Sequence, residues 1–454
     1  MTDRLTNYYT GWRFNPEETG VENHLEFLIE SSRWTLEQIK KYQFNKLKET
    51  IQNAYENTQY YRNTLEKLGI NPGQIKIPDD LKTIPFIEKE TIKKNYDAFI
   101  SKKVNKVELY KLTSGGSTGN PMEVFYDDNF NIKDRASTFF NLWLNKHHPL
   151  QSKSVRLHGD PIPEEKIKAG EYSFVVNGLK LVLSSQHINR NTCPDYVNQI
   201  SQFKPAYIHA YPSAIFSLCK LMAELNLLLR IKLDCVYCDS EMLYPGQKEF
   251  IESFLSCPVI QTYGHTEGCV CGISLKNCPD IHILPQVGYV EIIDAQGNWV
   301  TEPGKSGEIV VTGFYNEVFP LIRYKTSDIA TLTNPRDNCQ FRFFCAIKKI
   351  EGRKQDFAID KEGNSVPVAP ALFDYNIDWS GVQRFQIQQE KAGCLIVRVE
   401  LTRKPQKKSS IIIKLQRNLA TLFGKQFEIK VASVQEIPVT GRGKFRYFIQ
   451  KIKG

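Results

Sequence analysis

Residues 206–264 read AYIHAYPSAIFSLCKLMAELNLLLRIKLDCVYCDSEMLYPGQKEFIESFLSCPVIQTYG, in which short apolar runs alternate with longer amphipathic ones. The runs AYIHAYP, LDCVYCD and CPVIQTYG have the length and composition of strands or strand ends. The intervening stretches IFSLCKLMAELNLLL and PGQKEFIESFL have the length of helices. Because strands that alternate with helices build parallel sheet covered by helices, this region predicts an α/β fold.

The flanking sequence extends this pattern in both directions. Upstream, SVRLHGD and KLVLSS read as further strands, and residues 22–70 carry apolar residues at helical spacing. Downstream, the sequence pattern over about 286–345 is typical of β-strands, and a smaller α+β unit follows Arg353. We therefore expect a large, layered N-terminal α/β domain, whose helical first segment is 1–105 and whose core is 106–353, and a small, mobile α+β domain at 354–454.

Composition places the chain among ordinary globular proteins. It has 454 residues, of which 41% are hydrophobic and 24% charged. No apolar run reaches the roughly 20 residues that a membrane helix needs, and the N-terminus lacks the apolar core of a secretory signal. Eleven scattered cysteines, an odd number, favour reduced thiols over a disulfide scaffold. These features predict a cytoplasmic protein without a membrane span.

The positive charge is concentrated at the C-terminal end. The whole chain has 59 Lys+Arg against 50 Asp+Glu, and residues 403–454 alone hold 13 basic and 2 acidic side chains. Such a segment suits contact with phosphates or with an acidic partner, or it forms a solvated lysine-rich face. No zinc finger, RNA-recognition motif or helix-turn-helix accompanies it, so nucleic-acid binding is not expected.

The sharpest local motif is LTSGGSTGNP at residues 112–121. Its glycines let backbone amides approach an anion and its hydroxyls add donors, as in a phosphate-binding loop. It lacks the Gly-Lys-Ser/Thr ending of a Walker A loop. A flexible linker of the same composition is the alternative interpretation.

A second motif, QTYGHTEG at 261–268, follows the strand end PVI directly. Side chains placed there lie at the edge of a sheet, where α/β enzymes bind ligands. Tyr263 has the chemistry to stack on a base, Thr266 to bind a phosphate and Glu267 to hold Mg²⁺. Three further motifs are LIRYKTSD at 321–328, EGRKQD at 351–356 and IPVTGRGKFR at 437–446. In isolation, each of these four stretches is equally well explained as a turn or surface loop.

Taken in order, the five motifs resemble those of the adenylate-forming superfamily, and in particular the branch of phenylacetate–CoA ligases, coenzyme F390 synthetases and CapK. The similarity extends over essentially the whole chain and includes LKETIQNAYENTQYYRNTLEKLGI, YCDSEMLYPGQKEFIESFLSCPVIQTYGHTE and IPVTGRGKFRYFIQK. The resemblance implies an acyl-CoA synthetase-like fold. It also implies an enzyme that joins a carboxylic acid to AMP with release of pyrophosphate and then passes the acyl group to an acceptor.

The resemblance also implies roles for individual residues. The loop that would cradle the β- and γ-phosphates comprises Ser114, Gly115, Gly116, Ser117, Thr118 and Gly119. Residues near the adenine and along the nucleotide site would be Ser240, Glu241, Tyr263 and Gly264. Thr266 would touch the α-phosphate, Glu267 would hold Mg²⁺, and Asp328 with Arg353 would bind the ribose. The hinge would fall at Gln355, and Lys444 would be the catalytic lysine of adenylation, with Glu267 and Thr266 completing the catalytic group.

Two positions depart from the family pattern: Asn120 replaces a frequent lysine, and Gln355 gives a neutral hinge. The acyl pocket would include His209, Tyr211 and Pro212, with ordinary sheet packing as the alternative. The histidines His147 and His148 are expected to face solvent. A structural Zn²⁺ is a further expectation from a ligand-rich stretch containing Cys257, His265, Cys269, Cys271, Cys278 and His282.

The implied cofactors are ATP and Mg²⁺, with CoA as the most frequent acceptor in the relatives. Because CapK proteins are associated with polysaccharide biosynthesis, an amine, a sugar or a carrier-protein thiol is the main alternative acceptor. A nucleotide-binding protein without catalysis is a lesser alternative. For the assembly state, the alternatives are a monomer and a homodimer. The sequence does not specify the acid.

Overall fold

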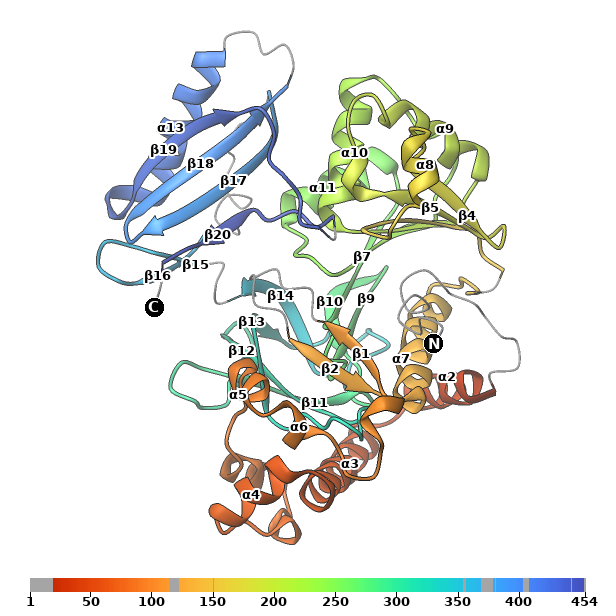
Figure 1. Ribbon diagram of the computed structural model, residues 1–454, viewed down its shortest axis with the longest axis vertical. Helices are drawn as coiled ribbons and strands as arrows, with labels where there is room; N and C mark the ends of the chain where they lie inside the picture. Colours follow the sequence, from red (N-terminus) through yellow and green to blue (C-terminus); the bar gives the residue numbers. More distant parts are fainter. Residues whose placement is uncertain are drawn as a thin grey trace. The chain divides into compact units, whose positions relative to one another are not determined.

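The computed structural model describes residues 19–113, 122–149, 151–353, 357–368, 379, 381–402, 408–441 and 443–452 (Figure 1). The chain divides into two compact units. Unit 1 contains Met1–Ser152 and Ile260–Ile350, and unit 2 contains Lys153–Val259 and Glu351–Gly454. Within the described residues, none of the helices has both the length and the apolar character needed to cross a bilayer.

Unit 1 begins with helices and a two-stranded antiparallel sheet. Its helices are α2 (Thr19–Ser31), α3 (Leu36–Asn57), α4 (Gln59–Lys67), α5 (Lys89–Lys94), α6 (Tyr96–Phe99) and α7 (Asp128–Leu144), with 3₁₀ turns η1 (Pro72–Gln74), η2 (Pro78–Thr83) and η3 (Lys106–Glu108). The small sheet pairs β1 (Tyr110–Thr113) with β2 (Glu123–Tyr126). The helical segment expected over 22–70 is therefore present, as α2, α3 and α4.

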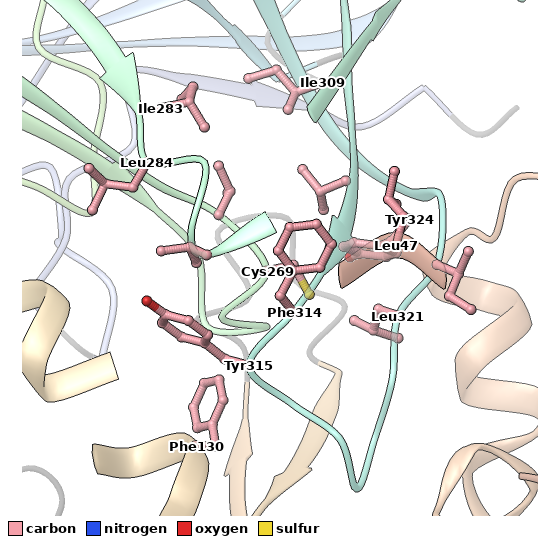
Figure 2. Close-up of a cluster of buried hydrophobic side chains, with 14 of the residues drawn as sticks. Leu47, Phe130, Cys269, Ile283, Leu284, Ile309, Phe314, Tyr315, Leu321 and Tyr324 are labelled. Carbon is pink, nitrogen blue, oxygen red and sulfur yellow. The ribbon is translucent and has the colours of Figure 1, made fainter. Parts of the chain in front are cut away.

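Helix α3 shows how the local sequence produces this structure. Thr35 caps the helix: its hydroxyl accepts from the Gln38 amide, and the Gln38 side chain accepts from the Thr35 amide. A stripe at helical spacing, including Leu47 and Ile51, is buried. Leu47 packs with residues from α7 and the later strands in a large apolar core, and Figure 2 shows it in that cluster with Phe130, Cys269, Ile283, Leu284, Ile309, Phe314, Tyr315, Leu321 and Tyr324.

The second part of unit 1 is a sheet in the order β11–β12–β13–β14–β10–β9–β8. Its strands are β8 (Val259–Gly264), β9 (Cys271–Leu275), β10 (Cys278–Ile283), β11 (Gly288–Ile293), β12 (Ser306–Gly313), β13 (Tyr324–Thr333) and β14 (Ala346–Arg353). The strands β11 to β13 confirm the β-rich region expected over 286–345. The pairs β11–β12, β12–β13, β10–β14, β9–β10 and β8–β9 are antiparallel.

Unit 2 contains the predicted parallel sheet, in the order β7–β6–β3–β5–β4. Its strands are β3 (Ser154–His158), β4 (Ser173–Val176), β5 (Lys180–Ser184), β6 (Tyr207–Ala210) and β7 (Cys235–Cys238), and only β4 is antiparallel to its neighbour. The helices are α8 (Glu164–Lys168), α9 (Cys193–Phe203), α10 (Pro212–Glu224) and α11 (Pro245–Leu255), with the turn η4 (Ser185–His187). Residues of α9, α10 and α11 share one buried core with the strands, so these helices cover the sheet.

The C-terminal part of unit 2 is a four-stranded sheet with a helix packed on it (Figure 1). The order is β19–β18–β17–β20, formed by β17 (Val382–Lys391), β18 (Cys394–Leu401), β19 (Glu428–Val434) and β20 (Phe448–Gln450). Helix α13 (Lys408–Phe423) and the turn η6 (Gly424–Gln426) follow the hairpin, and β15 (Phe357–Ile359) pairs with β16 (Ser365–Pro367). The hairpin turns at Gly393, whose φ is +71°, and α13 buries a face that includes Leu415 and Leu419.

One expectation about exposure was wrong. His148 is exposed, but His147 is buried, with a relative exposure of 4%. Lys146 adopts a positive φ of 62° just after α7, and the amide of His147 then donates to the Leu142 carbonyl at 2.9 Å. This reversal folds the residue back against the end of the helix, which the adjacent polar residues did not indicate.

Candidate active site

Three parts of the expected site lie wholly or partly outside the described residues. Residues 114–121 include the whole proposed phosphate loop, from Ser114 to Gly119. The proposed hinge residue Gln355 is likewise outside them, and Arg353 is described only as the last residue of β14. The assignments of these residues therefore remain predictions.

In unit 1, two predicted nucleotide-binding residues meet. Tyr263, near the end of β8, donates its hydroxyl proton to Oδ2 of Asp328 at 2.8 Å. Asp328 lies on β13 and is buried, with a relative exposure of 7%. Since the two residues are 65 positions apart in sequence, the fold brings together an aromatic ring and a carboxylate that could accept hydrogen bonds from vicinal hydroxyls.

Glu267 lies just after β8 in a loop of unit 1 and is buried, with a relative exposure of 6%. Its Oε1 accepts from the Tyr324 hydroxyl at 3.0 Å, and its Oε2 lies 3.2 Å from Nδ1 of His265. Burial raises the pKa of Glu267, but the contacts with His265 and Tyr324 outweigh burial and lower the pKa to about 2. Glu267 is therefore an oriented anionic oxygen ligand, of the kind that Mg²⁺ prefers.

The shape of this loop depends on Gly268. Its φ is +66°, and a Cβ at this position would lie 2.2 Å from Cζ of Phe130 on α7. Glycine is required on both counts, since L-residues avoid this conformation and the ring occupies the space. Thr266, half-buried, and Gly264, exposed, flank the same loop.

In unit 2, the residues after β7 bind the C-terminal lysine. The ammonium group of Lys444 donates to the Ser240 carbonyl at 3.0 Å and lies 5.4 Å from the centre of the Tyr211 ring. Glu241 accepts from the amide of Ser213 at 3.0 Å and from the amide of Phe445 at 2.9 Å. The fold thus joins Ser240, Glu241, Tyr211 and Lys444, which sequence reasoning had placed in three separate motifs.

The Lys444 turn is itself held by hydrogen bonds. Thr440 donates its amide to the Lys444 carbonyl at 2.8 Å and accepts the Lys444 amide on its hydroxyl at 3.1 Å. Gly443 has a φ of +72°, and its carbonyl accepts from the Ser185 hydroxyl at 3.3 Å. The Gln186 side chain donates to the Gly441 carbonyl at 2.7 Å. The lysine is consequently presented by an ordered turn.

Sequence reasoning missed a group beside the predicted acyl-pocket residues. Asp239 accepts from Nε2 of His209 at 2.7 Å and from Nε2 of His158 at 3.0 Å. The His158 ring also packs edge-on against Tyr211, with centroids 4.3 Å apart. Pro212 begins α10. A signal was available in the sequence. His158, His209 and Asp239 each lie at or next to the C-terminal end of a parallel strand, and the C-terminal ends of parallel strands meet at one edge of a sheet.

The expected zinc ligands do not converge as a set. Among the described residues, the ligand atoms of Cys278, His282 and Cys339 lie within 4.8 Å of one another. Of the six predicted ligands, only Cys278 and His282 belong to this group. Cys257, His265, Cys269 and Cys271 do not: Cys257 is in unit 2, and the Cys269 thiol donates to the Glu267 carbonyl. Cys339 joins because its loop leads into β14, which pairs with β10.

Comparison with known proteins identifies the family of the chain. Residues 95–317 match the family model for AMP-binding enzymes and residues 365–451 that for the CapK C-terminal domain, together about two thirds of the chain. The chain is 27% identical to protein CapK of Staphylococcus aureus, covering 87% of this chain and 86% of CapK. It is 24% identical to phenylacetate-coenzyme A ligase of Aromatoleum evansii, covering 96% and 99%.

Among solved structures, 2-hydroxyisobutyryl-CoA ligase in the postadenylation state, in complex with 2-HIB-AMP, is similar in fold. The TM-score is 0.70 at 20% sequence identity, and the match covers 90% of this chain and 89% of the ligase. The acyl-CoA ligase-like α/β fold expected from the sequence is therefore confirmed. The chain belongs to the adenylate-forming superfamily, in the branch that contains the phenylacetate–CoA ligases and CapK, and is an AMP-forming ligase.

Proposed function

We propose that this ligase converts a carboxylic acid and ATP to an acyl-adenylate and pyrophosphate, and then transfers the acyl group to the thiol of CoA. Family membership supports the adenylation step. The relatives named phenylacetate-coenzyme A ligase support CoA as the acceptor. A 2-hydroxyisobutyryl-CoA ligase of similar fold has been solved with both 2-HIB-AMP and CoA.

The observation that carries the proposal is the position of Lys444. Its ammonium group is presented by an ordered turn and donates to the carbonyl of Ser240, next to Glu241. The attack of a carboxylate on the α-phosphate brings two anions together, so a fixed cation lowers its barrier. We assign to Lys444 the stabilisation of that charge.

Apart from Arg353, the other proposed contacts come from residues of unit 1. Asp328, oriented by the Tyr263 hydroxyl, would accept hydrogen bonds from the ribose hydroxyls. Glu267, kept ionised by His265 and Tyr324, would hold Mg²⁺, whose charge would offset that of the triphosphate. Thr266 is the proposed α-phosphate contact. Ser114–Gly119 and Arg353 keep the phosphate and ribose roles that the resemblance assigns to them.

A pyrophosphate-release screen over carboxylic acids, with and without CoA, tests the activity. For an acid that is turned over, Lys444→Ala should lower acid-dependent ATP–pyrophosphate exchange by at least about 10²-fold, because an electrostatic contact to the transition state is lost. Lys430→Ala, an exposed lysine on β19, is the control and should exchange at the wild-type rate. Exchange by Lys444→Ala at the wild-type rate would remove this residue from the mechanism.

A second candidate acceptor is an amine, a sugar or a carrier-protein thiol. It is favoured by the match of residues 365–451 to the CapK C-terminal domain. The same screen separates the two functions, because an enzyme of this type would form the adenylate but would not release AMP faster when CoA is added. A nucleotide-binding protein without catalysis would show ATP binding and no exchange with any acid.

Zinc remains a proposal, with a revised ligand set. Nε2 of His282 lies 3.1 Å from Sγ of Cys278 and 3.3 Å from Sγ of Cys339, and the three side chains are buried. Two thiols and an imidazole are the donors that Zn²⁺ prefers, and the ion would tie β10 to the loop before β14. Metal analysis of protein purified without a His tag should give about one zinc per chain, and Cys278→Ser should lose it. Metal-free protein of unchanged thermal stability would contradict this.

The domain limits and the assembly state are also proposals. Boundaries near 105 and 353, with a hinge at Gln355, predict that limited proteolysis cuts first close to Gln355 and releases a fragment of about the size of residues 354–454. Light scattering coupled to size-exclusion chromatography decides between a monomer and a homodimer.

A further inference from the structure

The imidazole of His209 is held in one tautomer with a free lone pair. Its Nε2 lies 2.7 Å from Oδ2 of Asp239, so Nε2 carries the proton and Nδ1 is an acceptor. Within the described part of the chain, Nδ1 has no hydrogen-bond partner, and it is not closed off from solvent. The His209 side chain is 26% exposed. A carboxylate behind an imidazole and an accessible lone pair in front of it are the two structural requirements of a general base.

His158 shares the same carboxylate but cannot act in this way. Its side chain is 3% exposed, and its Nδ1 is buried with no hydrogen-bond partner among the described residues. Burial and the nearby Arg156 lower the pKa of His158 to about 3, so the ring stays neutral. It donates to Oδ1 of Asp239 at 3.0 Å and fixes the orientation of that carboxylate.

Asp239 keeps its negative charge in this setting. Burial opposes ionisation, but His209 and His158 together hold the pKa of Asp239 well below its ordinary value. Arg156, which forms an ion pair with Asp160 at 2.8 Å, adds positive charge nearby. The charged and titratable groups around His209 and Asp239 in the described residues are Arg156, His158, Asp160, Lys180, Tyr211, Tyr237, Cys238, Glu241 and Lys444. The positive charge of Arg156 would repel a metal ion bound to His158, His209 and Asp239. We therefore interpret His209 and Asp239 as a proton-accepting dyad and not as part of a metal site.

The dyad lies beside the lysine assigned to adenylation. Asp239 directly precedes Ser240, whose carbonyl accepts from Lys444. The Tyr211 ring is in contact with both the Lys444 ammonium group and the His158 ring. One side-chain cluster of unit 2 therefore contains the proposed adenylation lysine and an oriented base that adenylation does not use.

We propose that His209, oriented by Asp239, accepts the proton of the acyl acceptor in the second half-reaction. This inference rests on the proposed function, because it needs an acyl-adenylate formed in the first half-reaction. The acceptor is a nucleophile that carries a proton, and the demand on the base is greater for an amine or hydroxyl than for the more acidic CoA thiol.

The lone pair of the acceptor attacks the carbonyl carbon of the acyl-adenylate, and the carbonyl π electrons move to oxygen. The acceptor's proton moves to Nδ1 of His209. The tetrahedral intermediate then collapses, the bond between the carbonyl carbon and the phosphate oxygen breaks, and AMP leaves with that electron pair. His209 returns the proton to solvent, and no oxidant or reductant is consumed.

The kinetic test uses the full-length enzyme and an acid found by the pyrophosphate screen, with CoA and hydroxylamine as probe acceptors. Adenylate is formed on the enzyme, and its discharge is followed in a single turnover over a range of pH. We expect His209→Gln to slow discharge about 10²- to 10⁴-fold more than it slows ATP–pyrophosphate exchange. The rise of the wild-type discharge rate with pH should be absent from this variant.

His148→Gln is the control, since it removes an exposed imidazole of unit 1 that does not belong to the cluster. It should retain the wild-type shape of the discharge profile, even where stability falls. An equal loss in both half-reactions for His209→Gln would mean that the cluster is only structural. The same altered profile for His148→Gln would mean that the profile does not report on His209, and either result would overturn the proposal.

A spectroscopic test needs no substrate and separates this inference from the proposed function. Long-range ¹⁵N–¹H spectra of ¹⁵N-histidine-labelled protein should show His209, identified by its loss in His209→Gln, as the Nε2–H tautomer. In Asp239→Asn the population of that tautomer should fall. An Nδ1–H tautomer in the wild type would overturn the dyad whatever acid the enzyme uses. If no acid supports exchange, the proposed function fails, and the second half-reaction role fails with it.

Discussion

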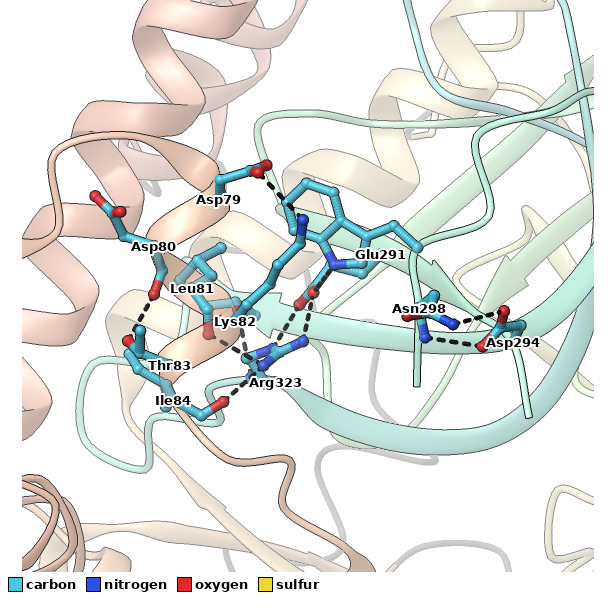
Figure 3. A network of polar contacts seen from close by, with 12 residues as sticks. Asp79, Asp80, Leu81, Lys82, Thr83, Ile84, Glu291, Asp294, Asn298 and Arg323 are labelled. Atoms are coloured by element: carbon cyan, nitrogen blue, oxygen red, sulfur yellow. Dashed lines mark hydrogen bonds and ion pairs between the residues drawn. The ribbon is translucent and has the colours of Figure 1, made fainter. Parts of the chain in front are cut away.

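Replacing Glu291 by glutamine removes the carboxylate that neutralises the buried guanidinium of Arg323. Nε and Nη2 of Arg323 donate to the two oxygens of Glu291 at 3.1 and 2.9 Å. Nη1 donates to the carbonyls of Leu81 and Ile84 at 3.0 and 2.6 Å, and Nε1 of Trp299 donates to Glu291 at 2.6 Å. Figure 3 shows Arg323 between Glu291 on β11 and the segment around η2.

The expected cost is large because neither partner reaches water. The side chains of Arg323 and Glu291 are 3% and 1% exposed. Breaking a buried pair while one charge remains costs about 3–5 kcal/mol. Glutamine keeps one acceptor oxygen, so we expect the lower end, about 3 kcal/mol, for Glu291→Gln. In a unit of roughly this size, this corresponds to a fall in melting temperature of about 6–12 °C.

Differential scanning calorimetry and urea unfolding of the full chain measure this effect. Together with Arg323→Gln and the double variant, Glu291→Gln forms a double-mutant cycle. Arg323→Gln should be more destabilising, because it also leaves the carbonyls of Leu81 and Ile84 with weaker partners. The double variant should be more stable than the sum of the two single losses predicts, by at least about 1 kcal/mol. A melting temperature within 2 °C of the wild type for Glu291→Gln, or strictly additive losses, would refute this reasoning.

Two further predictions concern the site. In the folded protein, His265 and Tyr324 lower the pKa of Glu267 from its ordinary 4.5 to about 2. The ionised carboxylate therefore stabilises the fold fully at neutral pH, and this stabilisation is lost as the pH falls from 4.5 towards 2. The melting temperature of Glu267→Gln should therefore approach that of the wild type as the pH is lowered from about 5 to about 3, and a constant difference would show that the charge does not contribute. Gly443→Ala should lower ATP–pyrophosphate exchange at least about tenfold, because it should displace the Lys444 turn. The φ of Gly443 is +72°, and the new Cβ would lie 2.1 Å from the Ser185 hydroxyl and 3.3 Å from the backbone of Gly159. Gly441→Ala, whose Cβ would meet nothing within 4 Å, is its control, and equal exchange by the two variants would argue against a fixed turn.

Much of the fold could be predicted because the decisive signals are local. The alternation in residues 206–264 gives β6, α10, β7, α11 and β8 close to their observed bounds. The apolar stripe and the cap of α3 and the glycine after α13 likewise act within a few residues. The same applies to the motif around Glu267, where the strand end at Gly264 and the turn at Gly268 are both visible in the sequence.

The composition of the site was only partly predictable. Tyr263 and Asp328 could each be identified from a motif, but the hydrogen bond between them spans 65 positions. Ser240 and Lys444 are 204 positions apart, and no pattern in either segment indicates the other. His158 and Asp239 were missed because each looks like an ordinary polar residue at the end of a strand until β3, β6 and β7 are placed side by side.

The predicted zinc ligands show that residues close in sequence need not be close in space. Proximity in sequence put six cysteine and histidine residues into one stretch. Most of them separate, because Cys257 belongs to unit 2 and His265 and Cys269 lie in the loop between β8 and β9. Cys339 enters the group from 57 positions beyond His282 because β14 pairs with β10. The sequence by itself determined which segments become helices and strands and which ordered motifs identify the family, since these depend on neighbours along the chain. Only the tertiary structure decided which side chains share a hydrogen bond, a charge or a metal-ligand group, because those interactions act over a few ångströms in space between residues that the chain keeps far apart.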